Sequence, residues 1–138
     1  MPAAVDAERL LQLVTEIFRV CTMNAQDAHL LADTLVDADL SGVHSHGVLR
    51  VPEYVEKLTA KGVNPQGRPR VVSGRGACQV VDGDNSMGQI GMHFAMKSAI
   101  AAAHEHGVGI VAIRGSNHSG AMAYYARLAV EADMIGWA

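Results

Sequence analysis

A short loop-like stretch divides this chain into two regions with different hydrophobic patterns. Residues 61–69 are rich in glycine, proline, asparagine and glutamine, a composition that interrupts helices and strands. Before this stretch, apolar residues recur at the three- and four-residue spacing of helices, whereas after it short apolar runs surround one alanine-rich segment. The sequence therefore predicts a helical region over residues 1–68 and an α/β region over residues 69–138.

The first region contains the start and stop signals of three helices. Asp6 can cap a first helix. Asn24 and Asp27 form a variant capping box at the start of a second helix, which Gly42 ends. Pro52 fits the first turn of a third helix, because deeper inside a helix it would remove a hydrogen bond and clash with the preceding turn. One stripe of the first helix is apolar and predicts a core face: Leu10, Val14, Ile17, Phe18 and Cys21.

The second region alternates short strands with helices. Two apolar runs around the tripeptide at residues 74–76 predict a β-hairpin with a three-residue loop. An alanine-rich segment at residues 89–106, followed by Gly107, predicts a long helix with a glycine C-cap. The unbroken apolar run at residues 108–113 predicts a buried strand, and residues 119–131 predict a further helix.

The charge balance argues against nucleic acid or an anionic membrane as a partner. The net charge is −3 and the sequence has no cluster of Lys or Arg, whereas such surfaces are bound through concentrated positive charge. Asp6 and Glu8 stand where a signal peptide has a basic start, and no apolar run approaches the roughly 20 residues of a membrane span. The distant Cys21 and Cys78 fit reduced thiols. We expect a cytoplasmic protein that binds small molecules or other protein chains.

Neither of two glycine patterns matches a nucleotide-binding motif. Gly107 and Gly109 precede the expected strand, whereas the dinucleotide fingerprint needs its glycines after a strand and at the start of a helix. Gly83, Gly88 and Gly91 precede a helix but lack the Gly-Lys-Ser/Thr of a phosphate-binding loop. The sequence therefore predicts an α/β fold that is not a Rossmann fold.

The strongest candidate for a functional site is the run from Ser45 to Arg50. An imidazole such as that of His46 can donate or accept a proton near neutral pH, and a guanidinium can hold a carboxylate through two hydrogen bonds. Ser45 can hold His46 in one tautomer. Tyr54, one helical turn beyond Arg50, either lines a pocket or packs in the core. The competing structural interpretations are a hydrogen bond from His46 to a backbone carbonyl and an ion pair between Arg50 and Glu53.

A second histidine-containing run, residues 116–120, predicts a companion site. His118 lies between an expected strand and an expected helix, where the backbone N–H groups of Gly120 and Ala121 favour an anion. Asn117 can donate a hydrogen bond to a substrate oxygen, although an Asn at a turn more often caps the backbone. The two runs together favour chemistry on a small organic acid.

These motifs together resemble those of the malate/L-lactate dehydrogenase family that lacks a Rossmann domain. The resemblance rests on residues 42–50 with Tyr54, on Val81-Asp82-Gly83, and on the Ser-Asn-His run at residues 116–118. It implies a helical N-terminal region followed by the beginning of a mixed, largely antiparallel sheet that binds NAD or NADP. It also implies a homodimer or a higher homo-oligomer.

The resemblance further implies an oxidoreductase that transfers a hydride between a nicotinamide cofactor and a small 2-hydroxy or 2-oxo acid. It implies that His46 or His118 is the acid/base, the other orienting substrate or nicotinamide. Arg50 would bind the substrate carboxylate, and His118 with Gly120 would contact the cofactor. The candidate site residues are Ser45, His46, Arg50, Tyr54, Asn117, His118 and Gly120.

A non-catalytic role is the alternative. An expected strand begins near Met134, and the chain ends inside it at Ala138. This pattern predicts a truncated fragment that acts as a dimerisation or binding module and is unstable as an isolated monomer, because unpaired strand edges and apolar helix faces need cover.

A histidine-based metal site is a further alternative to a dehydrogenase. His44 and His46 lie on one turn and can face a common ion. His104 and His106 are two residues apart on a helix, where side chains point roughly 200° apart, so they cannot chelate one ion together. A site at His44 and His46 would also need a carboxylate or thiolate, which the spacing does not identify, so no metal is expected at the site.

Overall fold

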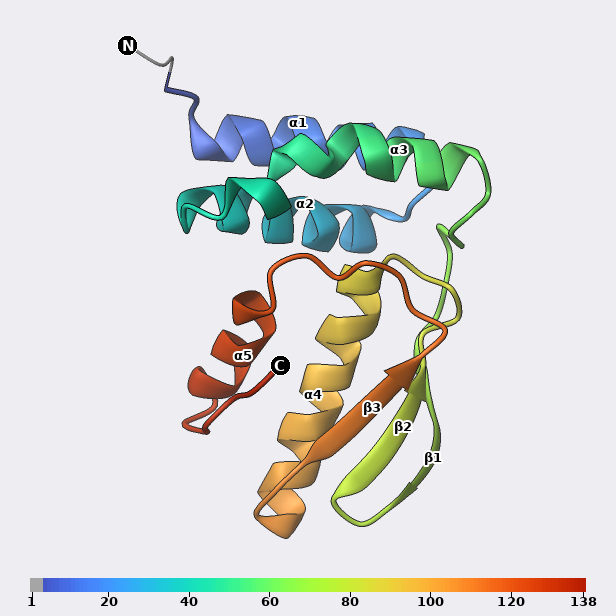
Figure 1. The fold of residues 1–138 in the computed structure, drawn as a ribbon, viewed down its shortest axis with the longest axis vertical. Coiled ribbons are helices and arrows are strands. Elements are labelled where there is room, and N and C mark those ends of the chain that lie inside the picture. Colours follow the sequence, from blue (N-terminus) through green and yellow to red (C-terminus); the bar gives the residue numbers. More distant parts are fainter. Residues whose placement is uncertain (1–3) are drawn as a thin grey trace. The chain divides into compact units, whose positions relative to one another are not determined.

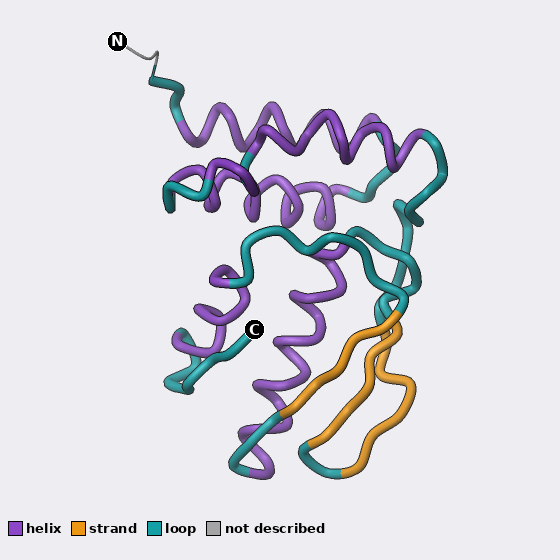
Figure 2. Tube along the Cα trace, viewed as in Figure 1, coloured by secondary structure: helices purple, strands orange, loops and turns teal. Residues whose placement is uncertain are grey.

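The computed structural model describes residues 4–138, which fall into two compact units that divide after Gln66. The first unit consists of helices and turns, and the strands of the described chain lie in the second (Figure 2). The predicted boundary, after residue 68, is two residues beyond this division.

Three α-helices form the helical unit: α1 (Ala7–Val20), α2 (Ala25–Leu40) and α3 (Val51–Thr59). Two short 3-10 turns, η1 (His44–His46) and η2 (Val48–Arg50), connect α2 to α3 (Figure 1). The candidate run from Ser45 to Arg50 therefore forms the connection between two helices.

Local capping signals set the ends of these helices as predicted. The side chain of Asp6 accepts a hydrogen bond from the backbone N–H of Arg9 at 2.9 Å, and that of Asn24 accepts one from Asp27 at 3.0 Å. Gly42, with φ of +76°, follows the end of α2 in the left-handed conformation that glycine adopts without strain. Pro52 lies in the first turn of α3, where its missing N–H costs nothing.

The core of the helical unit lies between α1 and α2 and extends to α3. Phe18, Leu31, Leu35 and Tyr54 have no exposed surface. Full burial of a side chain of this size is worth about 1.5–3 kcal/mol. Tyr54 therefore packs in the core, which is one of the two roles predicted for it.

The second unit is a mixed three-stranded sheet with helices. Its elements are β1 (Arg70–Arg75), β2 (Cys78–Asp82), α4 (Gly88–His106), β3 (Ile110–Arg114) and α5 (Ala123–Val130). The strand order is β1-β2-β3, in which β1 and β2 are antiparallel and β2 and β3 are parallel. Because parallel neighbours need a crossover, α4 joins β2 to β3 and packs on the sheet. The predicted α/β class with a mixed sheet is confirmed.

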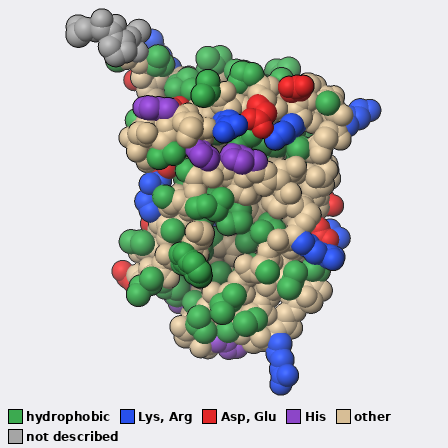
Figure 3. Space-filling model, viewed as in Figure 1, with side chains coloured by type: hydrophobic (Ala, Val, Ile, Leu, Met, Phe, Trp, Pro, Cys, Tyr) green, Lys and Arg blue, Asp and Glu red, His purple; other side chains and the backbone are tan. Residues whose placement is uncertain are grey.

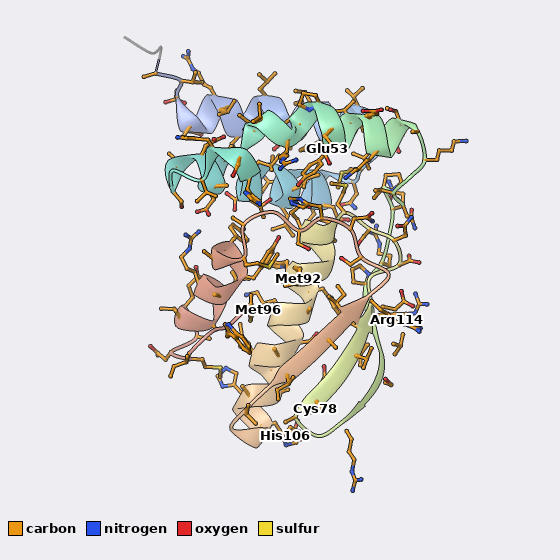
Figure 4. The ribbon with its side chains drawn as sticks, in the orientation of Figure 1. Glu53, Cys78, Met92, Met96, His106 and Arg114 are labelled. Carbon is orange, nitrogen blue, oxygen red and sulfur yellow. The ribbon has the colours of Figure 1, made fainter. Side chains whose placement is uncertain are left out.

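Helix α4 packs closely against the segment that leads into β3. A Cβ atom on Gly109 would lie 1.9 Å from the carbonyl oxygen of Ala99, so only glycine permits this approach. On α4, Met92 and Met96 lie toward α5 (Figure 4), where Tyr125 is fully buried. Helix α4 thus holds both β3 and α5.

The hairpin and β3 differ from the sequence predictions. The hairpin loop is the pair Gly76-Ala77 rather than residues 74–76, because the strands continue through Arg75 past an irregularity in register near Val72. Strand β3 begins at Ile110, which is 57% exposed, although an unbroken apolar run predicted a buried strand. Within the described residues, α4 covers only one face of this strand, so alternate side chains stay exposed.

The last segment also differs from its prediction. Helix α5 begins at Ala123 rather than near residue 119, and residues 134–138 form no strand. The chain instead turns back along α5, where the backbone N–H of Met134 donates to Ala129 at 2.9 Å. Among the helices of residues 4–138, none has the length and apolar character that crossing a membrane requires.

We predict that Gly109→Ala destabilises the protein by about 1–3 kcal/mol or more, because the new methyl group must push α4 away from the strand. Urea unfolding followed by circular dichroism measures the change. Gly62→Ala is the matched control, because its Cβ would lie 3.4 Å from the nearest carbonyl oxygen and Gly62 needs no positive φ. Equal stability of the two variants would contradict the close packing of Gly109.

Candidate active site

The turns η1 and η2 place His46 next to a hydroxyl group. The Oγ atom of Ser45 lies 2.9 Å from Nδ1 of His46, within hydrogen-bond distance. The His46 side chain is half-buried and that of Ser45 is exposed. Ser45 therefore contacts the ring nitrogen through which it could hold His46 in one tautomer. That role of Ser45 stays a prediction.

Arg50 is held at two points close to His46. Its Nε donates to the carbonyl oxygen of Ser45 at 2.8 Å, and its Nη1 donates to the Glu53 carboxylate at 2.8 Å. Lys57 donates to the other oxygen of Glu53 at 2.7 Å. Arg50 and Lys57 thus flank the Glu53 carboxylate in a basic–acidic–basic row. Figure 3 shows Lys or Arg side chains next to Asp or Glu side chains on the face drawn there. The ion pair with Glu53, predicted as the structural alternative for Arg50, is therefore present.

The row lowers the pKa of the Glu53 carboxyl group to about 2. The main cause is the hydrogen bond from Lys57, followed by that from Arg50. The group is solvent-exposed, and exposed ion pairs contribute little to stability. The row therefore matters for the orientation of the Arg50 guanidinium more than for the fold.

Sequence reasoning missed Asp39, which contacts both short turns. Its Oδ1 lies 2.9 Å from Nδ1 of His44, and its Oδ2 accepts the backbone N–H of Val48 at 2.8 Å. An aspartate at the end of α2 is itself a signal, because carboxylates are unfavourable near helix C-termini. Helical spacing does not predict its contact with Val48, which lies nine residues later in the chain.

The second candidate segment follows β3 and lies on the loop between β2 and α4. The side-chain amide of Asn117 donates to the backbone oxygen of Ser86 at 2.8 Å and to Oδ1 of Asn85 at 3.0 Å. It also donates to the backbone oxygen of Asn85 at 3.3 Å. Asn117 therefore ties two loops together, which is close to the backbone-capping alternative predicted for it. Its role toward a substrate stays a prediction.

The same loop is fixed by Asp82 at the end of β2. Its carboxylate accepts hydrogen bonds from the backbone N–H of Asp84 at 2.9 Å and from Nη2 of Arg114 at 3.2 Å. The hydrogen bond from Asp84, with the nearby charges of Arg114 and Arg70, holds the pKa of Asp82 below its usual range. This support places the oxygens that Asn117 binds.

Helix α4 begins directly against the candidate segment. A Cβ on Gly88 would lie 2.2 Å from the carbonyl oxygen of Asn117 and 2.4 Å from that of His118. The His118 side chain is exposed, and Gly120 has φ of +77°. Because α5 begins at Ala123, the N–H groups of Gly120 and Ala121 are not in its first turn, so the expected start of this helix is wrong. The anion site at these N–H groups stays a prediction.

The histidines do not form a metal cluster in the described part of the chain. Over residues 4–138, no group of three or more His, Cys, Asp or Glu side chains is placed to hold an ion. His104 and His106 lie in the last turn of α4, where positive charge is favourable.

Comparison with known proteins identifies the family. The family model for malate/L-lactate dehydrogenase matches residues 5–138. The chain therefore belongs to the malate/L-lactate dehydrogenase family, as the motifs predict. Its members include proteins named malate, sulfolactate and ureidoglycolate dehydrogenases.

Individual relatives show the extent of the similarity. A protein named malate dehydrogenase from Pyrococcus horikoshii is 40% identical over 132 residues, which are 96% of this chain and 37% of that protein. L-sulfolactate dehydrogenase from Methanocaldococcus jannaschii is 40% identical over 91% of this chain and 36% of its own length. The solved structure of the Pyrococcus horikoshii enzyme superposes with a TM-score of 0.92 at 38% identity, over 94% of this chain and 37% of that one. The chain thus spans little more than a third of the length of these relatives.

We predict that Lys57→Ala raises the pKa of Glu53 from about 2 toward 4.5, and more than Arg50→Ala does, because Lys57 is the larger cause of the shift. Both pairs are complete above pH 4.5 and are lost as the pH falls through about 2. NMR titration of the Glu53 carboxyl carbon measures the change. Lys61→Ala is the control and leaves the titration of Glu53 unchanged; a larger effect of Arg50→Ala would contradict the assignment.

We predict that Asn117→Ala lowers the free energy of unfolding by about 1–3 kcal/mol, because it removes the donor that joins the two loops. Asn117→Asp keeps the size but places a carboxylate against the Ser86 carbonyl oxygen, so it is at least as destabilising at neutral pH. Denaturant unfolding measures both variants. A fully stable Asn117→Asp would show that the amide does not hold the loops.

Proposed function

We propose that this chain carries the proton-transfer and carboxylate-binding residues of an oxidoreductase that interconverts a small 2-hydroxy acid and a 2-oxo acid with NAD or NADP. The observation that carries the proposal is the hydrogen bond between Ser45 and His46, in a chain that belongs to a dehydrogenase family. Relatives named for malate and sulfolactate support a substrate with a carboxylate beside the reacting carbon.

His46 is the proposed acid/base. When Nδ1 of His46 keeps its proton and donates it to the Ser45 hydroxyl oxygen, Nε2 is the nitrogen that is protonated in the imidazolium and free in the neutral imidazole. Nε2 can then protonate the oxygen of a 2-oxo acid as negative charge develops on it, and can accept the proton in the reverse direction. His118 is the second candidate for this role, or orients substrate or nicotinamide.

Arg50 is the proposed ligand of the substrate carboxylate. Its Nε and Nη1 already donate to Ser45 and Glu53, so the guanidinium plane is oriented before substrate arrives. A planar guanidinium in a fixed orientation selects a carboxylate over an uncharged carbonyl group. Tyr54, one helical turn after Arg50, is fully buried in α3 and anchors that helix in the core.

Residues of the second segment fit a cofactor-binding role. The Ser116 hydroxyl oxygen is buried and has no hydrogen-bond partner within residues 4–138, and Gly120 has φ of +77°, which glycine adopts without strain. We propose that His118 and Gly120 contact the cofactor, and that Asn117 keeps its loop in place for the substrate. A bound nicotinamide supplies or accepts the hydride. The predicted homodimer or higher homo-oligomer stays a prediction.

We predict that the native protein oxidises at least one of malate, lactate and sulfolactate, with NAD or NADP reduction followed by absorbance. His46→Asn should lower kcat by about 10²-fold or more and leave the Kd of the cofactor unchanged, because a general acid is lost. His29→Asn, on the exposed side of α2, is the control and keeps full activity.

Near-normal turnover of His46→Asn would assign proton transfer to His118. Failure of the native protein to oxidise any of the three acids with either cofactor would contradict the proposed function and favour a binding module.

A further inference from the structure

Asp39 places a carboxylate at the C-terminal end of α2, which is an electrostatically unfavourable position. It is in the last turn of α2, whose carbonyl groups carry partial negative charge, and this turn contains no basic residue. A carboxylate there is unfavourable for the helix. Its position must therefore be explained by the contacts it makes beyond α2.

The Asp39 carboxylate forms hydrogen bonds to the chain on both sides of His46. One carboxylate oxygen of Asp39 is 2.9 Å from Nδ1 of His44, in η1. The other accepts the backbone N–H of Val48, the first residue of η2, at 2.8 Å. The Asp39 side chain is 22% exposed, so these bonds are partly shielded from water. A single side chain thus anchors the residues two positions before and two positions after His46.

Gly47, between these two contacts, lies directly against the Asp39 carboxylate. A Cβ on Gly47 would lie 2.2 Å from Oδ1 and 2.4 Å from Oδ2 of Asp39. The φ of Gly47 is −86°, which any residue can adopt. Glycine is therefore required here by the nearness of Asp39 and not by the backbone conformation.

We propose that Asp39 is a positioning residue, which fixes the backbone that carries His46 so that its imidazole is in place before substrate binds. This inference rests on the proposed function of His46. Asp39 sets the position of the backbone, and Ser45 sets the orientation of the ring. A reacting group displaced by about 1 Å can lose about 10²-fold in rate, so such support is valuable to catalysis.

A test of the contact itself does not depend on activity. In Asp39→Ala, the amide hydrogen of Val48 should exchange with solvent at least tenfold faster, and the ring protons of His46 should change in NMR chemical shift. Asp39→Asn keeps an acceptor for the Val48 N–H and should restore slow exchange. Glu56→Ala, which removes an exposed carboxylate from α3, is the control and leaves both signals unchanged.

A second measurement uses Gly47. Gly47→Ala should strongly lower the unfolding midpoint in the natural background, because the new methyl group meets the carboxylate. In the Asp39→Ala background the same substitution should cost much less, because the obstructing atoms are gone. Equal costs in both backgrounds, or unchanged Val48 exchange in Asp39→Ala, would overturn the contact and with it the inference.

Activity of the native protein decides whether the contact serves the reaction. Asp39→Ala should lower kcat by about 10- to 100-fold with little change in the KM of the cofactor, and Asp39→Asn should recover most of the loss. If exchange at Val48 accelerates but kcat is unchanged while His46→Asn is inactive, Asp39 is only structural and the inference is wrong. If His46→Asn is fully active, the proposed role of His46 fails, and Asp39 then positions no catalytic group.

Discussion

The α/β unit depends on the close approach of two backbone segments, one on each side of β3, to helix α4. Strands β2 and β3 are parallel neighbours, so the helix that joins them must lie on the sheet. At one end, Gly109 brings the chain against the carbonyl group of Ala99, and at the other, Gly88 brings α4 against those of Asn117 and His118. The helix that closes the sheet connection therefore also sets the position of the Ser-Asn-His segment.

In the helical unit, α3 has one face buried in the core and one charged, accessible face. On α3, Tyr54 and Leu58 are buried, whereas Glu53 and Lys57 are on the accessible side. These positions alternate at helical spacing, so packing of the core face orients the charged face. Because Glu53 in turn holds Arg50, the orientation of the guanidinium follows from how the core face of α3 is buried.

Membership in the dehydrogenase family and the local geometry support the same chemistry. Ser45 engages one ring nitrogen of His46, and Arg50 is anchored to the backbone of Ser45. The proposed proton-transfer group and the proposed carboxylate ligand are thus linked through one residue, which suits a substrate whose carboxylate is next to its reacting carbon. The chain spans 37% of the length of its malate dehydrogenase relative, so this geometry describes what these residues contribute to the proposed reaction.

Much of the fold was predictable because its signals are local. Asp6 and Asn24 start helices by bonding to a backbone N–H three residues away, and Gly107 ends α4 with φ of +79°. The run from Ser45 to Arg50 was recognisable for the same reason, since its functional groups are within a few residues of one another. Predictions failed where a property depends on segments that pack against the residue in space. The exposure of Ile110, for example, depends on which elements cover β3.

By itself, the sequence determined the ends of the helices up to α4, the order of helices and strands up to α5, the mixed α/β class and the histidine–arginine run, because each depends on residues close together in the chain. Only the tertiary structure decided that Asn117 binds the loop at Asn85 and Ser86, about thirty residues earlier, and that Asp39 holds Val48. The physical reason is that such partners are chosen by how helices and strands pack, and hydrogen bonds between segments leave no periodic pattern in a sequence.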